Sequence, residues 1–136
     1  MKLSALYQIF LDCQSVTTDS RNCPDGSLFI ALKGESFNGN AFAKLALDSG
    51  CAFAIIDEIQ YAIEGDQRYI LVDDCLQTMQ QLANYHRRQL GTRVIGITGT
   101  NGKTTTKELI SSVLCQNHNV LYTLGNLNNH IGVPTT

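Results

Sequence analysis

The sequence predicts an α/β protein made of two units. A small α/β domain is expected over residues 1–88, and the beginning of a second, parallel-sheet domain over residues 89–136. Short apolar runs alternate with amphipathic segments in the first part, a pattern typical of proteins built around parallel strands. Further along, a glycine-rich loop lies between a strand-like run and a helical pattern. These two observations carry the fold prediction.

The first unit contains three continuous apolar runs, which predict buried strands over residues 28–32, 52–56 and 69–72. Helical spacing of apolar residues predicts helices over residues 3–11 and 41–48, and a third, three-to-four-turn helix that contains Leu76, Met79, Leu82, Ala83 and Leu90. We expect Asn40 to cap the second helix, and Asp73 and Asp74 to favour the start of the third. The polar, cap-forming residues 17–21 are expected to break the first helical pattern.

The second unit is expected to contain a strand over residues 94–98, a helix over residues 104–115 and another strand from residue 119 to residue 123. A parallel pair needs a crossover of a dozen or more residues, so only about one β–α–β crossover fits after residue 94. We therefore expect this unit to be incomplete.

Composition and charge exclude several classes of protein. Ten Lys and Arg face twelve Asp and Glu, for a net charge of −2, so the chain lacks the basic surface of a nucleic-acid binder. The longest apolar run, residues 51–56, is far too short to cross a membrane. Five well-separated cysteines without a C-x-x-C pair indicate reduced thiols, mostly packed in the core, in a cytoplasmic protein.

The strongest chemical signal is the segment GITGTNGKTT at residues 96–105. Glycines there let backbone N–H groups surround phosphate oxygens at the start of a helix. Lys103 would reach the β- and γ-phosphates of a nucleotide, and the Thr104 hydroxyl would coordinate Mg²⁺. The strict phosphate-loop pattern has glycine six positions before the lysine, where this chain has Ile97.

Three blocks in this order resemble the Mur ligase superfamily. The segment TGTNGKTT at 98–105 is similar to its phosphate loop, which shares the same offset from the strict pattern. DSR at 19–21 and PDGSLFIALKG at 24–34 resemble its N-terminal uridine-nucleotide domain. TKE at 106–108 and TLGNLNNHIGVP at 123–134 resemble the branch that joins D-alanyl-D-alanine to UDP-N-acetylmuramoyl-tripeptide. The resemblance covers nearly the whole chain.

The resemblance implies a small UDP-substrate-binding domain over residues 1–88 and the beginning of a P-loop, parallel-sheet ATPase domain over residues 89–136. It implies a cytoplasmic, monomeric amide ligase of peptidoglycan precursor synthesis, using ATP and Mg²⁺ through an acyl-phosphate intermediate. The implied ATP-binding residues are Gly99, Thr100, Asn101, Gly102, Lys103, Thr104 and Thr105, with Lys103 and Thr104 catalytic and Thr104 on the metal. The implied UDP-substrate-binding residues are Ser20, Arg21, Lys33, Gly34, Asn126, Asn128 and Asn129.

Each assignment has an alternative. Asp19 and Ser20 suit a turn, Lys33 a solvated strand exit, and the asparagines turns between glycines. Lys107 and Glu108 are expected to be exposed residues of the first helical turn. For the whole protein, the alternatives are the ligase that adds the third stem-peptide residue, a P-loop phosphotransferase or GTPase, and a non-catalytic UDP-sugar-binding module. The 136 residues alone are expected to be inactive as a ligase.

Overall fold

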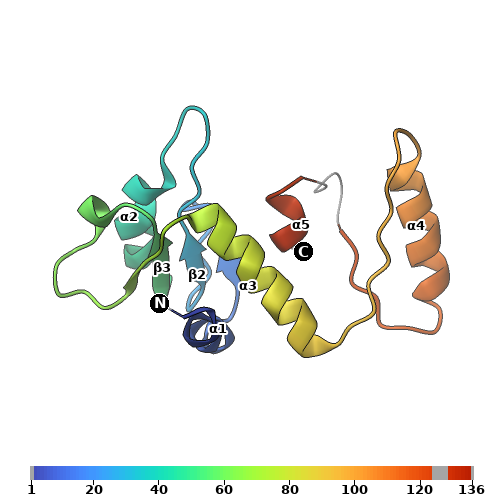
Figure 1. Ribbon diagram of the computed structural model, residues 1–136, viewed down its shortest axis with the longest axis horizontal. Coiled ribbons are helices and arrows are strands. Elements are labelled where there is room, and N and C mark those ends of the chain that lie inside the picture. The colour runs from blue at the N-terminus through green and yellow to red at the C-terminus, as the bar shows by residue number, and fades with distance from the viewer. Residues whose placement is uncertain (1, 124–128, 136) are drawn as a thin grey trace. The chain divides into compact units, whose positions relative to one another are not determined.

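The computed structural model describes residues 2–123 and 129–135, and it divides the chain into two compact units, Met1–His86 and Arg87–Thr136. Figure 1 labels the main elements. The helices are α1 (Leu3–Asp12), α2 (Ala43–Asp48), α3 (Cys75–Leu90), α4 (Lys103–Leu114) and α5 (Gly132–Thr135), with 3₁₀ turns η1 (Gly39–Phe42) and η2 (Ile59–Tyr61). The strands are β1 (Val16–Thr17), β2 (Leu28–Ile30), β3 (Phe53–Ile56) and β4 (Tyr69–Leu71).

The first unit is built on a four-stranded parallel sheet in the order β1-β2-β3-β4. Leu28 pairs with Val16 on one side and with Phe53 on the other, and Ile55 pairs with Ile70. All three residues of β2 are buried, as expected for a strand covered on both faces. The continuous apolar runs therefore predicted the three longer strands correctly.

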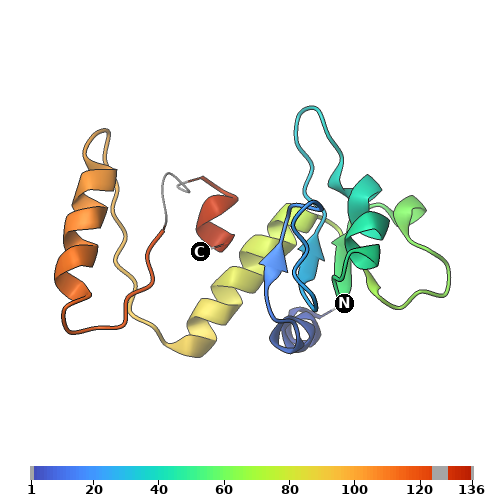
Figure 2. The same ribbon diagram turned by 180° about the vertical axis from the view of Figure 1, so that it is seen from behind.

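Helices cover this sheet. The helix α2 packs against β2 and β3 through Ala43, Ala46 and Leu47, which are buried. The helix α3 lies over one face of the sheet: it is in front of the strands in Figure 1 and behind them in Figure 2. Aromatic contacts join α1 to α3: the Tyr7 and Tyr85 rings are 4.9 Å apart, and the Tyr7 hydroxyl lies 3.1 Å from Nδ1 of His86.

The helix starts differ from the sequence prediction in one place. Asp74 behaves as expected, since its Oδ1 accepts from the backbone N–H of Gln77 at 2.7 Å at the start of α3. The predicted Asn40 cap is wrong: Asn38 caps η1, accepting from the backbone N–H of Asn40 at 3.0 Å, and the α-helix itself begins at Ala43. Asn40 is instead buried, with 1% of its surface exposed.

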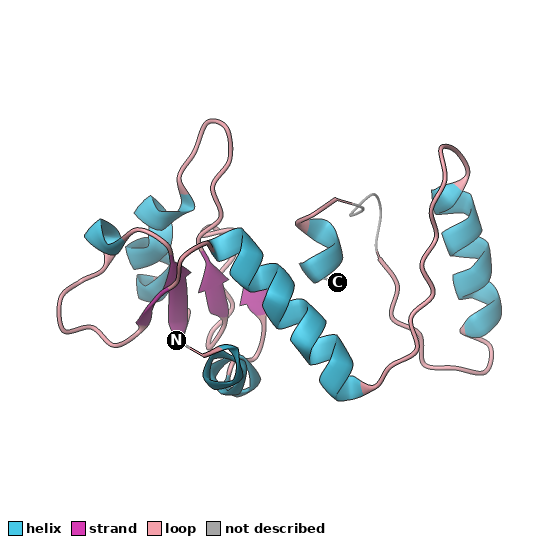
Figure 3. Ribbon diagram, viewed as in Figure 1, coloured by secondary structure: helices cyan, strands magenta, loops and turns pink. Residues whose placement is uncertain are grey.

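Two strand assignments were also wrong, and one strand was not predicted. Val16–Thr17 forms β1, where the sequence predicted only a polar break. Residues 94–98 and 119–123 are irregular in this structure, although both were predicted as strands; Figure 3 shows them as loops. A strand needs a neighbour for its backbone hydrogen bonds, and within the described part of the chain no ladder includes either segment.

The second unit therefore consists of α4, α5 and connecting segments. One face of α4 forms an apolar groove lined by Leu109, Ile110, Val113 and Leu114, and Leu109 and Val113 are exposed. The cysteines are mixed in their packing: Cys51 and Cys75 are buried, Cys13 and Cys23 are half-buried, and Cys115 is exposed. Burial raises the pKa of the Cys75 thiol to about 12. The predicted core role therefore holds fully for two of the five.

Candidate functional site

The glycine-rich loop leads directly into α4. Gly99 (φ 147°) and Gly102 (φ 79°) lie in the region that favours glycine, and Gly102 caps the helix. A Cβ at Gly102 would meet no atom within 4 Å, so the requirement there is conformational rather than steric. Because the first N–H groups of a helix lack intrahelical partners, the loop presents donors to solvent where an anion would bind.

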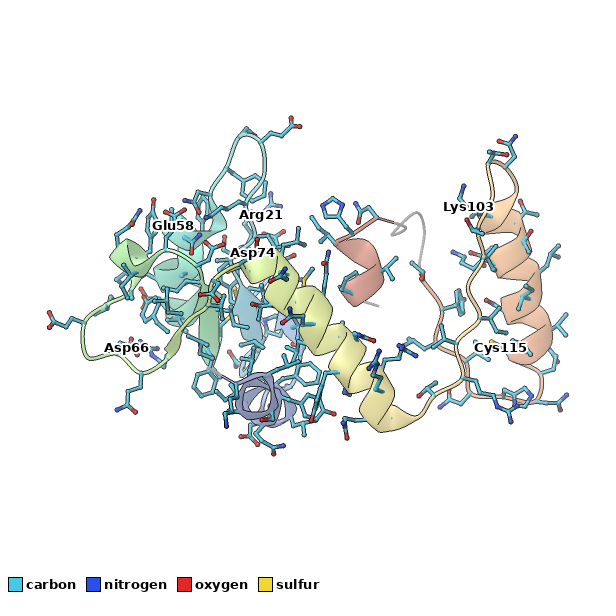
Figure 4. The ribbon with its side chains drawn as sticks, viewed as in Figure 1. Arg21, Glu58, Asp66, Asp74, Lys103 and Cys115 are labelled. Atoms are coloured by element: carbon cyan, nitrogen blue, oxygen red, sulfur yellow. The ribbon has the colours of Figure 1, made fainter. Side chains whose placement is uncertain are left out.

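Lys103 stands at the beginning of α4, as its label in Figure 4 shows. Its Nζ donates to the carbonyl oxygen of Gly99 at 2.6 Å, so the ammonium folds back over the loop. Thr100, Asn101, Thr104 and Thr105 are exposed around it. The structure thus places all seven residues of the expected ATP-binding set on one loop and one helical turn.

The donor set fits a magnesium ion only in part. Mg²⁺ prefers oxygen ligands in octahedral geometry and usually keeps waters and substrate phosphates among them. The Thr104 hydroxyl is an oxygen donor in an exposed position. Within residues 2–123 and 129–135, no group of three or more His, Cys, Asp or Glu is placed to hold a metal. Thr104 could therefore supply one ligand, beside waters and substrate phosphates.

In the first unit, the expected UDP-substrate residues follow the carboxyl ends of parallel strands. Ser20 and Arg21 follow β1, and Lys33 and Gly34 follow β2. Loops after the strands of a parallel sheet meet at one edge, which is where ligands of open α/β sheets bind. In Figure 4, the labelled Arg21, Glu58 and Asp74 lie toward the same end of the strands.

Arg21 is paired within its own loop. Its Nε and one terminal nitrogen donate to the two carboxylate oxygens of Asp19 at 2.9 and 2.8 Å, and its backbone N–H donates to Oδ1 at 3.0 Å. The Arg21 hydrogen bonds lower the pKa of Asp19 to about 2. The Arg21 side chain nevertheless remains 87% exposed, so both the turn and a ligand-facing guanidinium are compatible with this geometry.

Lys33 is both solvated and paired, since 45% of its side chain is exposed. Its Nζ lies 2.8 Å from Oε1 of Glu58 and 2.9 Å from Oδ1 of Asp57, and hydrogen bonds to Glu58 and Asp57 raise its pKa. Gly34 faces the ring of Phe37, where a Cβ would approach within 2.2 Å, so a side chain cannot enter without moving that ring. The loop that Lys33 and Gly34 begin is thereby fixed to the end of β3.

The buried amide of Asn40 joins the same network, a role that the sequence pattern did not predict. Nδ2 of Asn40 donates to Oδ1 of Asp57 at 2.8 Å, while Oδ1 of Asn40 accepts from the backbone N–H of Asp57 at 3.0 Å. Oδ2 of Asp57 accepts from the backbone N–H of Cys75 at 3.3 Å. Desolvation raises the pKa of Asp57, but hydrogen bonds from Lys33 and Asn40 outweigh it, and the net shift is downward. The turn motif at residues 38–40 was the only sequence signal near this contact.

Of the three asparagines in the predicted cluster, the structure describes Asn129. Asn126 and Asn128 lie outside the described residues. Oδ1 of Asn129 accepts from the backbone N–H groups of Ile131 at 3.1 Å and Gly132 at 2.7 Å, so its side chain forms the turn that precedes α5. The turn-forming alternative is thus what the geometry shows for this oxygen of Asn129.

The environment of Lys107 differs from the sequence prediction. It was expected on the exposed first turn of the helix, but its side chain is only 15% exposed. Its Nζ donates to the carbonyl oxygen of Thr123 at 2.6 Å, pairs with the Glu108 carboxylate at 3.0 Å and lies 5.9 Å from the centre of the Tyr122 ring. Glu108, by contrast, is exposed as expected.

Family models match both units. The model described as "Mur ligase family, catalytic domain" covers residues 12–87, and the "Mur ligase middle domain" covers residues 97–136. No helix among the described residues is long and apolar enough to traverse a bilayer.

Curated relatives named UDP-N-acetylmuramoyl-tripeptide–D-alanyl-D-alanine ligase are similar over most of the chain. The protein from Bacillus subtilis is 48% identical, covering 89% of this chain and 26% of its own length. The protein from Escherichia coli is 41% identical, covering 90% of this chain and 26% of its own length. The chain thus spans about a quarter of the length of the relatives it matches.

Solved structures agree with these relatives. A MurF crystal structure from Acinetobacter baumannii superposes with a TM-score of 0.82 at 34% identity, covering 98% of this chain and 31% of that one. The MurF ligase from Thermotoga maritima in complex with ADP gives a TM-score of 0.81 at 31% identity, covering 93% and 29%. These matches confirm the α/β fold class and the resemblance to this branch. The chain belongs to the Mur ligase family.

Proposed function

We propose that this chain forms the UDP-substrate-binding and phosphate-loop parts of a cytoplasmic, monomeric ATP-dependent ligase. The ligase would join D-alanyl-D-alanine to UDP-N-acetylmuramoyl-tripeptide during peptidoglycan precursor synthesis. The observation that carries the proposal is the loop of residues 99–105, in which a left-handed glycine opens a helix beside an inward-folded lysine. The relatives of this chain carry that activity in their names, and one is bound to ADP in its solved structure.

The reaction divides into two balanced steps. The terminal carboxylate of the tripeptide attacks the γ-phosphorus of ATP, the bond to the β,γ-bridging oxygen breaks, and an acyl phosphate and ADP result. The amine of D-alanyl-D-alanine then attacks the acyl carbon, the tetrahedral adduct expels inorganic phosphate, and the amine proton is lost. Stabilising the charge on the transferred phosphoryl group is the main task of the protein in the first step.

Each residue of the loop has a part in this scheme. Backbone N–H groups of Gly99, Thr100, Asn101, Gly102 and Thr105 bind phosphate oxygens. Lys103 exchanges its bond to the Gly99 carbonyl for the β- and γ-phosphates, a short movement for a half-buried lysine at the helix start. Thr104 holds Mg²⁺, which supplies charge neutralisation when bound.

The second set of proposed residues binds the UDP-linked substrate. We propose that residues 1–88 bind the uridine diphosphate through Ser20, Arg21, Lys33 and Gly34, and that residues 89–136 begin the ATP-binding domain. Asn126, Asn128 and Asn129 are proposed to face the muropeptide. An exposed guanidinium suits bidentate phosphate contact, which supports Arg21. The charge of Lys33 is already balanced by the carboxylates of Asp57 and Glu58. Lys33 can therefore contribute to diphosphate binding only if its ammonium is shared between these carboxylates and the diphosphate.

The test uses the complete protein encoded by the reading frame that contains these residues. Supplied with ATP, Mg²⁺, UDP-tripeptide and D-alanyl-D-alanine, it is expected to release phosphate and form a UDP-pentapeptide, detected by mass spectrometry. Lys103→Ala should abolish turnover while largely sparing UDP-tripeptide binding, measured by calorimetry. Equal loss of both would contradict the division between the two sets of residues. Product formed only with a single amino acid and a UDP-dipeptide would favour the ligase that adds the third residue.

The 136 residues alone provide a second arm. We expect them to form no pentapeptide under the same conditions, because they span about a quarter of the relatives' length and no group of three or more His, Cys, Asp or Glu among the described residues is placed to hold a metal. Ligation by the purified 136-residue chain would overturn that expectation.

A further inference from the structure

A lysine outside the proposed ATP set connects the phosphate-loop helix to the segment that precedes the asparagines. Lys107 lies one helical turn after Lys103 on α4, so the two side chains share a face of the helix. While Lys103 turns back to the loop, Lys107 turns to the chain 16 positions further on. The two lysines therefore hold two different segments against the same helix.

The contacts of Lys107 include Thr123, Glu108 and Tyr122. Its Nζ donates to the Thr123 carbonyl oxygen at 2.6 Å and pairs with the Glu108 carboxylate at 3.0 Å. Its ammonium also lies 5.9 Å from the centre of the Tyr122 ring, within the range of a cation–π contact. With only 15% of its side chain exposed, Lys107 is largely shielded from water, where such interactions gain strength.

The position of the acceptor decides what this contact does. Thr123 is the last described residue before residues 124–128, and two of the three asparagines proposed to face the muropeptide, Asn126 and Asn128, lie in that stretch of sequence. In the absence of a sheet ladder over residues 119–123, the described hydrogen bond that ties Thr123 to α4 is the one from Lys107. Lys107, on the helix that begins at the phosphate loop, thus holds Thr123, the residue from which the asparagine segment starts.

We propose that Lys107 is a positioning residue: by holding the Thr123 carbonyl against α4, it fixes where the asparagine segment begins relative to the phosphate loop. This inference rests on the proposed ligase function for its kinetic consequence, although the contact itself does not. Unlike Lys103, which donates to a carbonyl, Lys107 also pairs with a carboxylate and is only 15% exposed, so we assign it a role through the Tyr122–Thr123 backbone and not on a phosphate.

The kinetic test compares three variants of the complete protein. Lys107→Met keeps the length and apolar stem of the side chain but removes the charge and donors. It is expected to lower kcat/KM for the UDP-tripeptide about tenfold or more, the order expected for losing a charge-assisted hydrogen bond, while the KM for ATP changes by less than about threefold. Lys107→Arg retains charge and donors and should recover most of the loss. Glu108→Gln removes only the exposed partner and should stay within about twofold of the parent protein.

Two outcomes would overturn the inference. Equal losses toward ATP and UDP-tripeptide would mean that Lys107 maintains the helix and loop as a whole. No loss in Lys107→Met would mean that the asparagine segment is positioned by other contacts. Should Lys107→Met fold poorly by circular dichroism, Lys107→Gln, which keeps a neutral donor, takes its place in the same comparison.

A second readout separates this inference from the proposed function. Hydrogen–deuterium exchange of the peptide covering residues 119–123 is expected to rise in Lys107→Met, and to remain at the parent level in Lys107→Arg and Glu108→Gln. If the parent protein shows no ligation, the proposed function fails, yet this exchange comparison still tests the contact. Unchanged exchange in Lys107→Met would refute the positioning role whatever the protein catalyses.

Discussion

Replacing Asn40 by alanine should destabilise the first unit more than replacing any exposed asparagine. The Asn40 amide is 1% exposed and makes two hydrogen bonds to Asp57, one with its carboxylate and one with its backbone N–H. Alanine removes both and leaves the backbone N–H of Asp57 facing a cavity. Buried polar groups that lose their partners bear the full cost of having left water.

The size of the effect follows from these two bonds. A hydrogen bond to a charged group contributes about 1.5–3 kcal/mol and a neutral one about 1 kcal/mol, so the expected loss in the free energy of unfolding is about 3 kcal/mol. For a unit of 60–100 residues, about 1 kcal/mol corresponds to roughly 4–8 °C in Tm, which gives an expected decrease of about 12–24 °C.

The cost should also depend on pH. The pKa of Asp57 is lowered in the folded protein, so its ionised form contributes stability above the ordinary value of 3.8, and that contribution is lost as the pH falls through the folded value. Because Asn40 is one of the groups that lower this pKa, the difference between parent and Asn40→Ala should be largest near neutral pH and shrink below about pH 4.

The assay is urea unfolding followed by far-ultraviolet circular dichroism at several pH values. Asn22→Ala is a matched control, since Asn22 is exposed and its replacement should change stability by less than about 0.5 kcal/mol. A loss below about 1 kcal/mol in Asn40→Ala at neutral pH, or a loss that does not change with pH, would refute the role assigned to this amide.

Two further predictions concern helix starts. Asp74→Ala removes the acceptor for the Gln77 N–H and should cost about 1 kcal/mol in urea unfolding, whereas Asp73→Ala, next to it and exposed, should cost less than half of that. Gly102→Ala forces a side chain into φ 79° and should cost about 1–2 kcal/mol without any steric clash, together with a weaker affinity for ATP measured by calorimetry. A Gly102→Ala protein with parent-like ATP affinity would show that the loop tolerates another backbone conformation.

The parts of the fold that could be predicted from sequence are those with a strong local pattern. β2 and β3 are continuous apolar runs buried on the sheet, and α3 follows a capping carboxylate with apolar residues at helical spacing. β1 escaped prediction because it has two residues, only one of them apolar, and pairs with a single neighbour. Residues 94–98 carry a strand-like pattern, but a pattern alone supplies no hydrogen-bonding partner.

The candidate site divides in the same way. The loop around Lys103 could be predicted because its chemistry depends on residues adjacent in sequence, and its two left-handed glycines stand where the motif needs them. The partners of Lys33 could not, because Asp57 and Glu58 follow a different strand and meet Lys33 only when the sheet forms. Lys107 was misplaced for the same reason: nothing near it in sequence indicates the carbonyl of Thr123.

These partnerships rank the two cations proposed to hold the uridine diphosphate. The pair of Arg21 with Asp19 is exposed, with 87% of the arginine side chain accessible, and exposed pairs are weak because water screens them, so a phosphate can replace Asp19 at little cost. Lys33 would have to leave Asp57, whose side chain is only 10% exposed and which is also bound by Asn40. Opening that contact exposes a largely buried carboxylate to an incoming anion, and like charges repel.

Arg21→Ala should therefore weaken UDP binding more than Lys33→Met does. We expect a loss of about tenfold or more for Arg21→Ala, the scale of a charge-assisted hydrogen bond, and a loss below about threefold for Lys33→Met once protein stability is matched by lowering the temperature. Isothermal calorimetry of UDP with the complete protein measures both, and Asp19→Asn, which frees Arg21 from its partner, should not weaken binding by more than about twofold. The reverse ranking would mean that the diphosphate displaces Lys33 from its carboxylates, and that the network around Asp57 opens when substrate binds.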